Sequence, residues 1–208
     1  MLPAGFPYIF IGPRKSSWTS VGLLISAELA GSLHFLDDVG NDRVLWFSLP
    51  LAGLQRPILV AAVYAPSNDS QFWTSLLQER SLLLRRENAL ATLILGDLNV
   101  HLADLVCHAD SCSCLHCRPT SEDKLVRTLL SVHGLVCLNP PEHPTRVSGT
   151  IIDLVLTDDP ARFCCPCVSA PGSIAKSDHS LFRFEFSAEV PCAYGAGFGR
   201  VWWASSAE

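Results

Sequence analysis

The chain has 208 residues, a length that fits one domain, and 49% of them are hydrophobic. This apolar content, with a formal net charge of −5, excludes a disordered chain and a module that binds nucleic acid through net positive charge alone. The longest apolar stretches, Val21–Ile25 and Ile58–Val63, are far shorter than the roughly 20 residues of a spanning helix. The first residues also lack a basic segment followed by a long apolar run, so we expect neither a membrane span nor a signal peptide.

Short apolar runs bounded by turn-forming residues predict strands, and two longer segments that begin with capping residues predict helices. In chain order, strands are expected over residues 21–26, 44–49, 58–64, 92–95, 135–138, 150–157 and 181–186. One helix is expected from residue 71 to about residue 87, after the third strand. A second helix is expected over 121–133, after the fourth strand. This order suits a layered α/β domain built on a sandwich of sheets.

The expected domain covers residues 1–187, with an irregular insertion at about 103–120 that is rich in Cys, His, Asp and Ser. Residues 188–208 contain several glycines and are expected to form a tail or linker. The sequence has no internal repeat and gives no sign of a second domain.

The nine cysteines are an odd number and are clustered, unlike the even framework of a disulfide-rich secreted domain. We therefore expect a reducing, intracellular location, nuclear or cytoplasmic, and not a secreted protein. Part of the insertion has zinc-like spacing, but known closed sites use two separated pairs of ligands. A cysteine-rich variable loop is therefore favoured over a structural zinc ion, whose ligands would be Cys107, Cys112, Cys114 and Cys117.

Asp97 and Asn99 come directly after the expected strand 92–95. Residues two apart share one face of an extended chain, so both side chains are expected on the same side. The carboxylate could take a proton from water, and the amide could donate a hydrogen bond to a phosphoryl oxygen. On these residues alone, an Asp–Asn turn that closes the strand is the favoured alternative.

Asp153 lies in the middle of the apolar segment 150–157, where a carboxylate is costly unless it has a partner. We expect His179 as this partner, because a carboxylate orients an imidazole ring and stabilises its protonated form. Asp178 and His179 also form a pair before the last expected strand, and such a pair can hold a metal ion or protonate a leaving group. Two alternatives stay open: backbone amides as the partners of Asp153, and a surface loop for His179.

Taken together, four segments resemble the ordered motifs of the endonuclease/exonuclease/phosphatase superfamily, the DNase-like enzymes. Any one of these motifs is weak, but four in the same order are specific. The segment 144–153 is most similar to the endonuclease domains of LINE-type retrotransposons. The four segments are Tyr64-x-Pro66, Gly96-Asp97-Leu98-Asn99, Ile152-Asp153-Leu154-Val155 and Ser177-Asp178-His179.

The resemblance implies a four-layered α/β/β/α sandwich and a divalent cation, Mg²⁺ or Mn²⁺. It also implies metal-dependent hydrolysis of phosphodiesters by a DNA endonuclease of the retroelement type. DNA would be the substrate, with no membrane and no obligate protein partner, and a reverse transcriptase would be encoded nearby. The alternatives are a non-catalytic remnant of such a domain, and a relative that hydrolyses RNA or a small phosphoester.

The resemblance also assigns roles to individual residues. Asp97 would activate or position the attacking water, and Asn99 would hold the phosphate. Tyr64 would contact the phosphate or stabilise developing charge. His179 would act as the acid or the phosphate-stabilising group, oriented by Asp153.

Two further positions follow from the resemblance: Asp178 at the metal site, and Thr145 beside the phosphate. Members of the family begin with a strand that carries an Asn, and the main metal ligand is a Glu that follows it. Residues 1–17 contain no Asn, Asp or Glu, and the first acidic residue is Glu28. We therefore expect an N-terminally truncated domain that lacks its first strand, which is central in its sheet, and holds an incomplete magnesium site.

Overall fold

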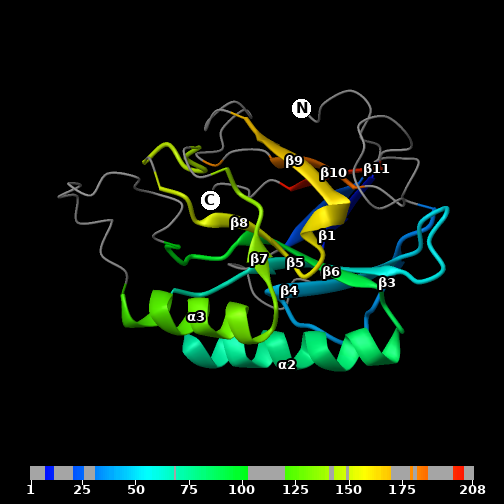
Figure 1. The fold of residues 1–208 in the computed structure, drawn as a ribbon, viewed down its shortest axis with the longest axis horizontal. Coiled ribbons are helices and arrows are strands. Elements are labelled where there is room, and N and C mark those ends of the chain that lie inside the picture. The colour runs from blue at the N-terminus through cyan, green and yellow to red at the C-terminus, as the bar shows by residue number, and fades with distance from the viewer. Residues whose placement is uncertain are drawn as a thin grey trace.

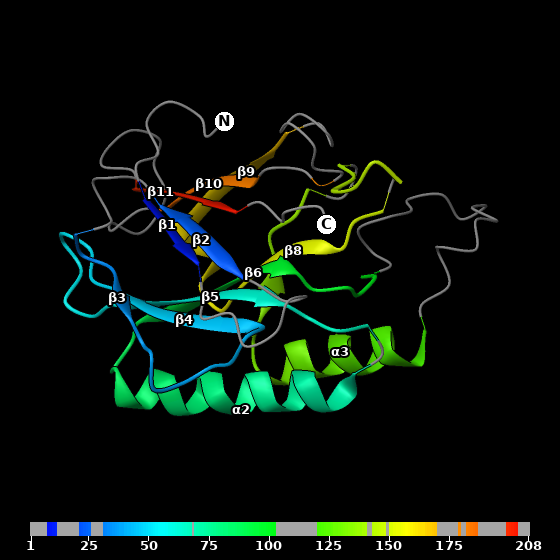
Figure 2. The same cartoon turned by 180° about the vertical axis from the view of Figure 1, so that it is seen from behind.

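The strands form two sheets that are stacked face to face, and two α-helices lie together on the outer side of one sheet (Figure 1). The view from behind shows the same three layers (Figure 2). The structure is a computed structural model, and it describes residues 8–11, 21–25, 31–67, 69–102, 120–140, 143–148, 150–169, 179, 182–186 and 199–203.

The larger sheet has six strands and forms the middle layer. Its two central strands, β5 and β6, run parallel, and every other pair of neighbours is antiparallel. In spatial order the strands are β3 (His34–Phe35), β4 (Val44–Leu49), β5 (Ile58–Tyr64), β6 (Ala91–Asp97), β8 (Asp153–Thr157) and β7 (Val136–Cys137).

Helix α2 (Ser70–Arg86) connects the parallel strands β5 and β6, and α3 (Ser121–Val132) follows β6. Side chains close the first turn of each helix: Asp69 accepts a hydrogen bond from the Phe72 backbone nitrogen at 2.9 Å, and Thr120 and Asp123 cap α3 reciprocally. A short 3₁₀ helix, η3 (Pro160–Arg162), follows β8. Among the described residues, neither α-helix has the length and apolar character needed to cross a membrane.

The six-stranded sheet is buried on both faces, which explains the continuous apolar runs of its central strands. Trp46 of β4 packs in one cluster with Trp73 of α2, between the sheet and the helices. Its neighbour Phe47 packs in a second cluster with Leu23 and Phe163, which belong to the other sheet. Because successive side chains of a strand point to opposite faces, each apolar run serves both layers.

The smaller sheet has five strands, and all its neighbouring pairs are antiparallel. Its spatial order is β1 (Tyr8–Ile11), β2 (Gly22–Ile25), β11 (Gly199–Trp203), β10 (Phe182–Phe186) and β9 (Phe163–Val168).

The structure thus confirms the α/β sandwich and differs from expectation at both ends of the chain. Strand β1 precedes the first expected strand and forms an edge. Strand β11 lies within the stretch 188–208 that we assigned to a tail, yet it stands between β2 and β10 in the middle of its sheet. The sheet therefore includes residues beyond 187. Both described α-helices cover the same sheet, so the second outer helical layer of a four-layered sandwich is not among the described residues.

A buried arginine connects α2 to the sheet. Arg80 is 4% exposed, forms an ion pair with Asp158, and donates a hydrogen bond from Nε to Thr92 Oγ1 at 3.1 Å. Asp158 also accepts a hydrogen bond from the Thr92 backbone nitrogen at 2.7 Å. These contacts join the middle of α2 to the start of β6 and the end of β8.

Replacing Arg80 by leucine is expected to lower the free energy of unfolding by roughly 3 kcal/mol, because it leaves Asp158 without its charged partner. Denaturant unfolding measures the loss. Arg85→Leu on the exposed side of the same helix is the matched control and should stay within about 0.5 kcal/mol of the parent. Equal losses for the two variants would show that the buried ion pair contributes no more to the free energy of unfolding than an exposed arginine does.

Candidate active site

Three polar side chains stand in a row where neighbouring strands of the larger sheet meet. Tyr64 is paired in register with Asp97 across β5 and β6, and Asp97 is paired with Asp153 across β6 and β8. Directly opposed residues of antiparallel strands project to the same face, so the two carboxylates are neighbours. Asp97 is 6% exposed, Asp153 is fully buried, and Tyr64 is 39% exposed.

The end of β6 is held in place by its backbone. Gly96 has a φ of +149°, and a Cβ atom there would lie 1.8 Å from the carbonyl oxygen of Val63 on β5. Asn99 has a φ of 46°, so the chain turns sharply two residues after Asp97. The Asn99 backbone nitrogen donates to Asp97 Oδ1 at 3.2 Å, and its side-chain amide donates to the carbonyl of Ala65 at 2.8 Å. The turn therefore joins the ends of β5 and β6.

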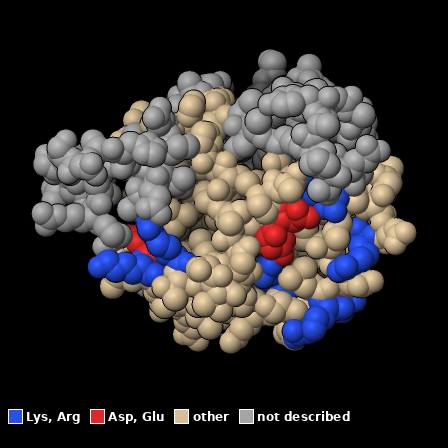
Figure 3. Space-filling model, viewed as in Figure 1, with Lys and Arg blue, Asp and Glu red and all other residues tan. Residues whose placement is uncertain are grey.

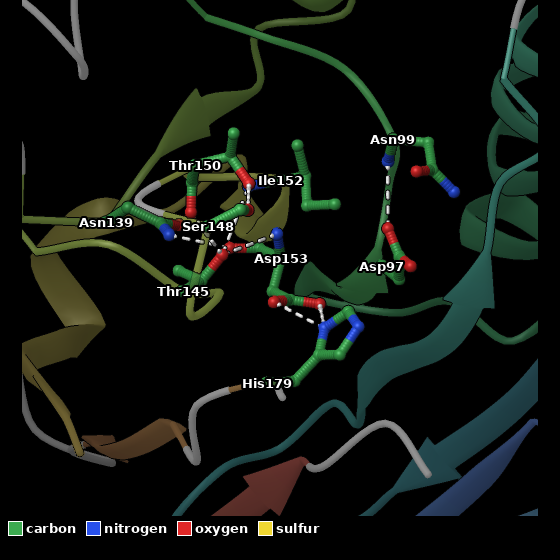
Figure 4. A network of polar contacts seen from close by, with 9 residues as sticks. All are labelled: Asp97, Asn99, Asn139, Thr145, Ser148, Thr150, Ile152, Asp153 and His179. Atoms are coloured by element: carbon green, nitrogen blue, oxygen red, sulfur yellow. Dashed lines mark hydrogen bonds and ion pairs between the residues drawn. The ribbon is translucent and has the colours of Figure 1, made fainter. Parts of the chain in front are cut away.

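Asp153 and His179 form the contact that their sequence context predicts. His179 Nδ1 lies 2.9 Å from each carboxylate oxygen of Asp153, and the imidazole is 6% exposed (Figure 4). A backbone bridge between His179 and Arg146 places the histidine beside the segment that precedes β8. The pair is thus sequestered from water and fixed from both sides.

Two buried side chains hold the backbone around Asp153. Thr145 Oγ1 accepts hydrogen bonds from the backbone nitrogens of Ile152 and Asp153, each at 3.1 Å. Asn139 donates to the Asp153 carbonyl at 2.8 Å and accepts from the Val155 nitrogen at 2.8 Å (Figure 4). Thr145 is fully buried. The Thr145 hydroxyl therefore positions the backbone of Asp153, and its expected contact with phosphate stays a prediction.

Burial and charge repulsion set the protonation of the two carboxyl groups. Burial raises the pKa of Asp97 to about 6, with a further contribution from the nearby Asp153. Burial also raises the pKa of Asp153, and its hydrogen bond with His179 opposes this rise. Two adjacent buried carboxyl groups form a site where a cation would favour the ionised forms.

Asp97, Asp153 and His179 offer ligand atoms that all lie within 4.8 Å of one another. Carboxylate oxygens are the ligands that Mg²⁺ and Mn²⁺ prefer, so the residues fit a hard divalent cation. In this cluster Asp153 is hydrogen-bonded to His179 Nδ1, whereas Asp97 accepts its hydrogen bond from the Asn99 backbone nitrogen. The metal ligand expected at Asp178 and the zinc ligands expected at residues 107–117 lie outside the described residues.

The raised pKa of Asp97 predicts a pH dependence of stability in the metal-free protein. The pKa of Asp97 is about 6 in the folded state and 3.8 for a free side chain. Between these two pH values the folded state therefore keeps a proton on Asp97 that the unfolded state has lost. Raising the pH from 4 to 7 should therefore remove roughly 2–3 kcal/mol of stability through this group. Denaturant unfolding in EDTA measures the change.

Asp97→Asn is the control, because the isosteric amide does not titrate. Its stability should fall less over the same pH range, and at pH 7 it should exceed that of the parent. If both proteins show the same pH dependence, the pKa of Asp97 is not raised in the folded protein.

Comparison with known proteins identifies the family. A model of the endonuclease-reverse transcriptase family matches residues 58–183, more than half of the chain. The chain therefore belongs to this family, within the endonuclease/exonuclease/phosphatase superfamily that its motifs resemble. The matched segment runs from β5 to β10 and includes Asp97, Asp153 and His179. The comparison with curated proteins gives no match.

Solved structures share the fold at low sequence identity. The endonuclease domain of TRAS1, a telomere-specific non-LTR retrotransposon, matches with a TM-score of 0.62 and 13% identity over 94% of this chain and 76% of that chain. The AP endonuclease LMAP from Leishmania major matches with a TM-score of 0.63 and 14% identity over 96% and 70% of the two chains. The 3′ phosphatase NExo from Neisseria, bound to a product DNA hairpin, matches with a TM-score of 0.56 and 17% identity over 88% and 80%.

Proposed function

We propose that this protein is a metal-dependent phosphodiesterase that nicks DNA, an endonuclease of the retroelement type. The observation that carries the proposal is the buried contact between Asp153 and His179, beside Asp97 at the junction of β6 and β8. A carboxylate, an imidazole and a second carboxylate are groups that can move the protons of a phosphodiester hydrolysis. The match to an endonuclease-reverse transcriptase family supports this reaction class.

The proposed role of His179 follows from its contact with Asp153. A carboxylate at Nδ1 fixes the tautomer in which this nitrogen carries the proton, and it stabilises the imidazolium form. Nε2 is then the atom that exchanges a proton with the substrate. We assign His179 to protonation of the leaving oxygen or to stabilisation of charge on the phosphate.

Asp97 would position the attacking water and contact the metal ion, with Asp178 as the second carboxylate of this proposed site. A bound Mg²⁺ ion would neutralise phosphate charge and lower the pKa of its water. Asn99 borders Asp97, and its side-chain amide contacts the carbonyl of Ala65, so we propose that it holds the end of β5 as well as the phosphate. Tyr64, at the exposed end of β5, would contact the phosphate.

Charge on the protein supports a role for a cation in binding DNA. The formal net charge is −5, so the overall field repels phosphate. On the face shown in Figure 3, the Lys and Arg side chains of the described residues lie in separate groups with Asp and Glu between them. Attraction of DNA would therefore come from the metal ion and a few local arginines rather than from a continuous basic surface.

Nicking of supercoiled plasmid by the purified chain tests the proposal. We expect nicked circles with Mg²⁺, no nicking in EDTA, and a rate at least a hundredfold lower for Asp97→Asn. Asp37→Asn, an exposed carboxylate between β3 and β4, should match the parent. If the folded protein hydrolyses only RNA or only a small phosphoester, that compound replaces DNA as the proposed substrate. Folded protein inactive on all three substrates would favour a non-catalytic remnant.

A further inference from the structure

A cavity of about 420 Å³ opens beside Asn99, next to the cluster of Asp97, Asp153 and His179. Four segments form it: the chain after β5, the chain after β6, the start of α3, and the turn before β8. Its volume is in the range of small-molecule binding sites, and nine of its ten lining residues have polar side chains. The lining residues are Ser67, Asn99, His101, Thr120, Glu122, Asp123, Arg146, Ser148, Thr150 and Ile152.

One wall of the cavity carries a positive charge and hydroxyl groups. Arg146 is held through its backbone, which donates to the carbonyl of Thr150 at 3.1 Å and forms the bridge with His179. Ser148 and Thr150 hydroxyls lie 2.9 Å apart on the same turn. The Arg146 charge also reaches the site already described, since it lowers the pKa of both Asp97 and Asp153. This wall is suited to an anionic group close to the catalytic residues.

The part of the lining formed by the chain after β6 and the start of α3 carries two carboxylates and a histidine. The His101 backbone nitrogen donates to Asp123 Oδ1 at 2.8 Å, and Asp123 also closes the cap of α3 with Thr120. Glu122 accepts a hydrogen bond from the Asp69 backbone nitrogen at 2.8 Å. His101 Nδ1 is buried and has no hydrogen-bond partner among the described residues. A ligand that supplied this hydrogen bond would be favoured, because a buried polar atom left without one is costly.

We propose that this cavity binds the nucleotide next to the cleaved phosphodiester, with Arg146 on its phosphate and His101 Nδ1 on its base. This inference rests on the proposed function. The carboxylates of Glu122 and Asp123 would repel a second phosphate on their wall, which fixes the orientation: anion toward Arg146, base toward α3. The histidine nitrogen and the carboxylate oxygens are groups that can recognise the polar edge of a base. His101 is thus a specificity-determining residue and Arg146 a phosphate-binding residue.

Substitutions of Arg146 should change the affinity for DNA, and substitutions of His101 should change the base preference. DNA affinity is measured by fluorescence anisotropy in EDTA, where metal-dependent cleavage is prevented, over a range of salt concentrations. Arg146→Gln should weaken binding roughly tenfold for all sequences and reduce the slope of log affinity against log salt by about one. Arg146→Lys, which keeps the charge, should keep the slope. Arg85→Gln on α2 is the control and should match the parent.

His101 is tested by sequencing the nick sites that each protein makes in a random-sequence duplex with Mg²⁺. The parent should prefer one base at a position flanking the nick, and His101→Leu should lose this preference. His101→Asn, whose amide can occupy the place of Nδ1, should keep most of it. Melting temperatures within a few degrees of the parent would show that each variant is folded.

The outcomes separate this inference from the proposed function. If the parent nicks DNA but Arg146→Gln and His101→Leu behave as the parent does, the endonuclease proposal stands and the inference that the cavity binds a nucleotide is wrong. If the parent binds DNA in EDTA with the expected Arg146 effects but does not nick it with Mg²⁺, the phosphate wall is supported and the endonuclease proposal fails. A parent that binds no DNA, either in EDTA or with Mg²⁺, contradicts the inference about the cavity.

Discussion

His179→Ala is expected to lower the rate of DNA nicking by a factor of roughly 10²–10⁴, the contribution typical of a general acid or base. His179 is 6% exposed and fixed by Asp153, and it is the histidine of the cluster with Asp97. Asp153→Asn should have an effect of similar size, because it removes the charge that stabilises the imidazolium and disturbs the tautomer. Single-turnover kinetics at saturating Mg²⁺ measures both losses.

An exposed histidine provides the matched control for this prediction. His34→Ala, in the edge strand β3, should leave the nicking rate unchanged. Circular dichroism and denaturant unfolding establish that the slow variants are folded. If folded His179→Ala nicks DNA at a rate within threefold of the parent, His179 does not take part in the reaction.

Gly96→Ala is expected to destabilise the fold by roughly 4 kcal/mol or more, a loss at the far end of the range for single substitutions. The added methyl group would lie 1.8 Å from a backbone oxygen of β5, where only movement of the strands can relieve the clash. The φ of +149° is also a conformation that residues with a Cβ rarely adopt. Because Asp97 is the next residue, any movement would also displace its carboxylate from Asp153.

Gly134→Ala separates the clash from the backbone preference. Gly134 also has a positive φ, +65°, but no atom lies within 4 Å of the position that an added methyl group would occupy. We expect a loss of about 1 kcal/mol there, from backbone strain alone. Denaturant unfolding of both variants measures the difference. Similar losses at the two glycines would show that β5 and β6 do not approach as closely as the structure has them.

The central strands could be predicted from the sequence because two packing layers act on them at once. Strands β4 and β5 match the expected ranges 44–49 and 58–64, since burial on both faces makes nearly every position apolar. Three of the four strands that were not expected, β3, β9 and β11, lack a continuous apolar run. Strand β9 contains Pro166, which normally argues against a strand but is accommodated at an edge, and β9 is an edge strand.

The site could be predicted where its chemistry is costly and could not where it depends on distant hydrogen bonds. A carboxylate in an apolar strand needs a partner, and His179 was expected in this role, with backbone amides as the alternative; the structure has the contact with His179. The role of Asn139 had no such signal, because an Asn after a strand reads as a turn residue and its contacts with β8 are 14 and 16 residues away. The position of Thr145 beside the phosphate came from the family resemblance, and the sequence does not show that its hydroxyl holds the backbone of Asp153.

A double-mutant cycle between Asp153 and His179 tests the central claim most directly. The measured quantity is the single-turnover rate of DNA nicking by Asp153→Asn, His179→Ala and the double variant. If Asp153 acts through His179, the double variant should be no more than about threefold slower than His179→Ala alone. Losses that multiply would show that the two residues act independently, and would contradict the role of Asp153 as the group that orients His179 for catalysis.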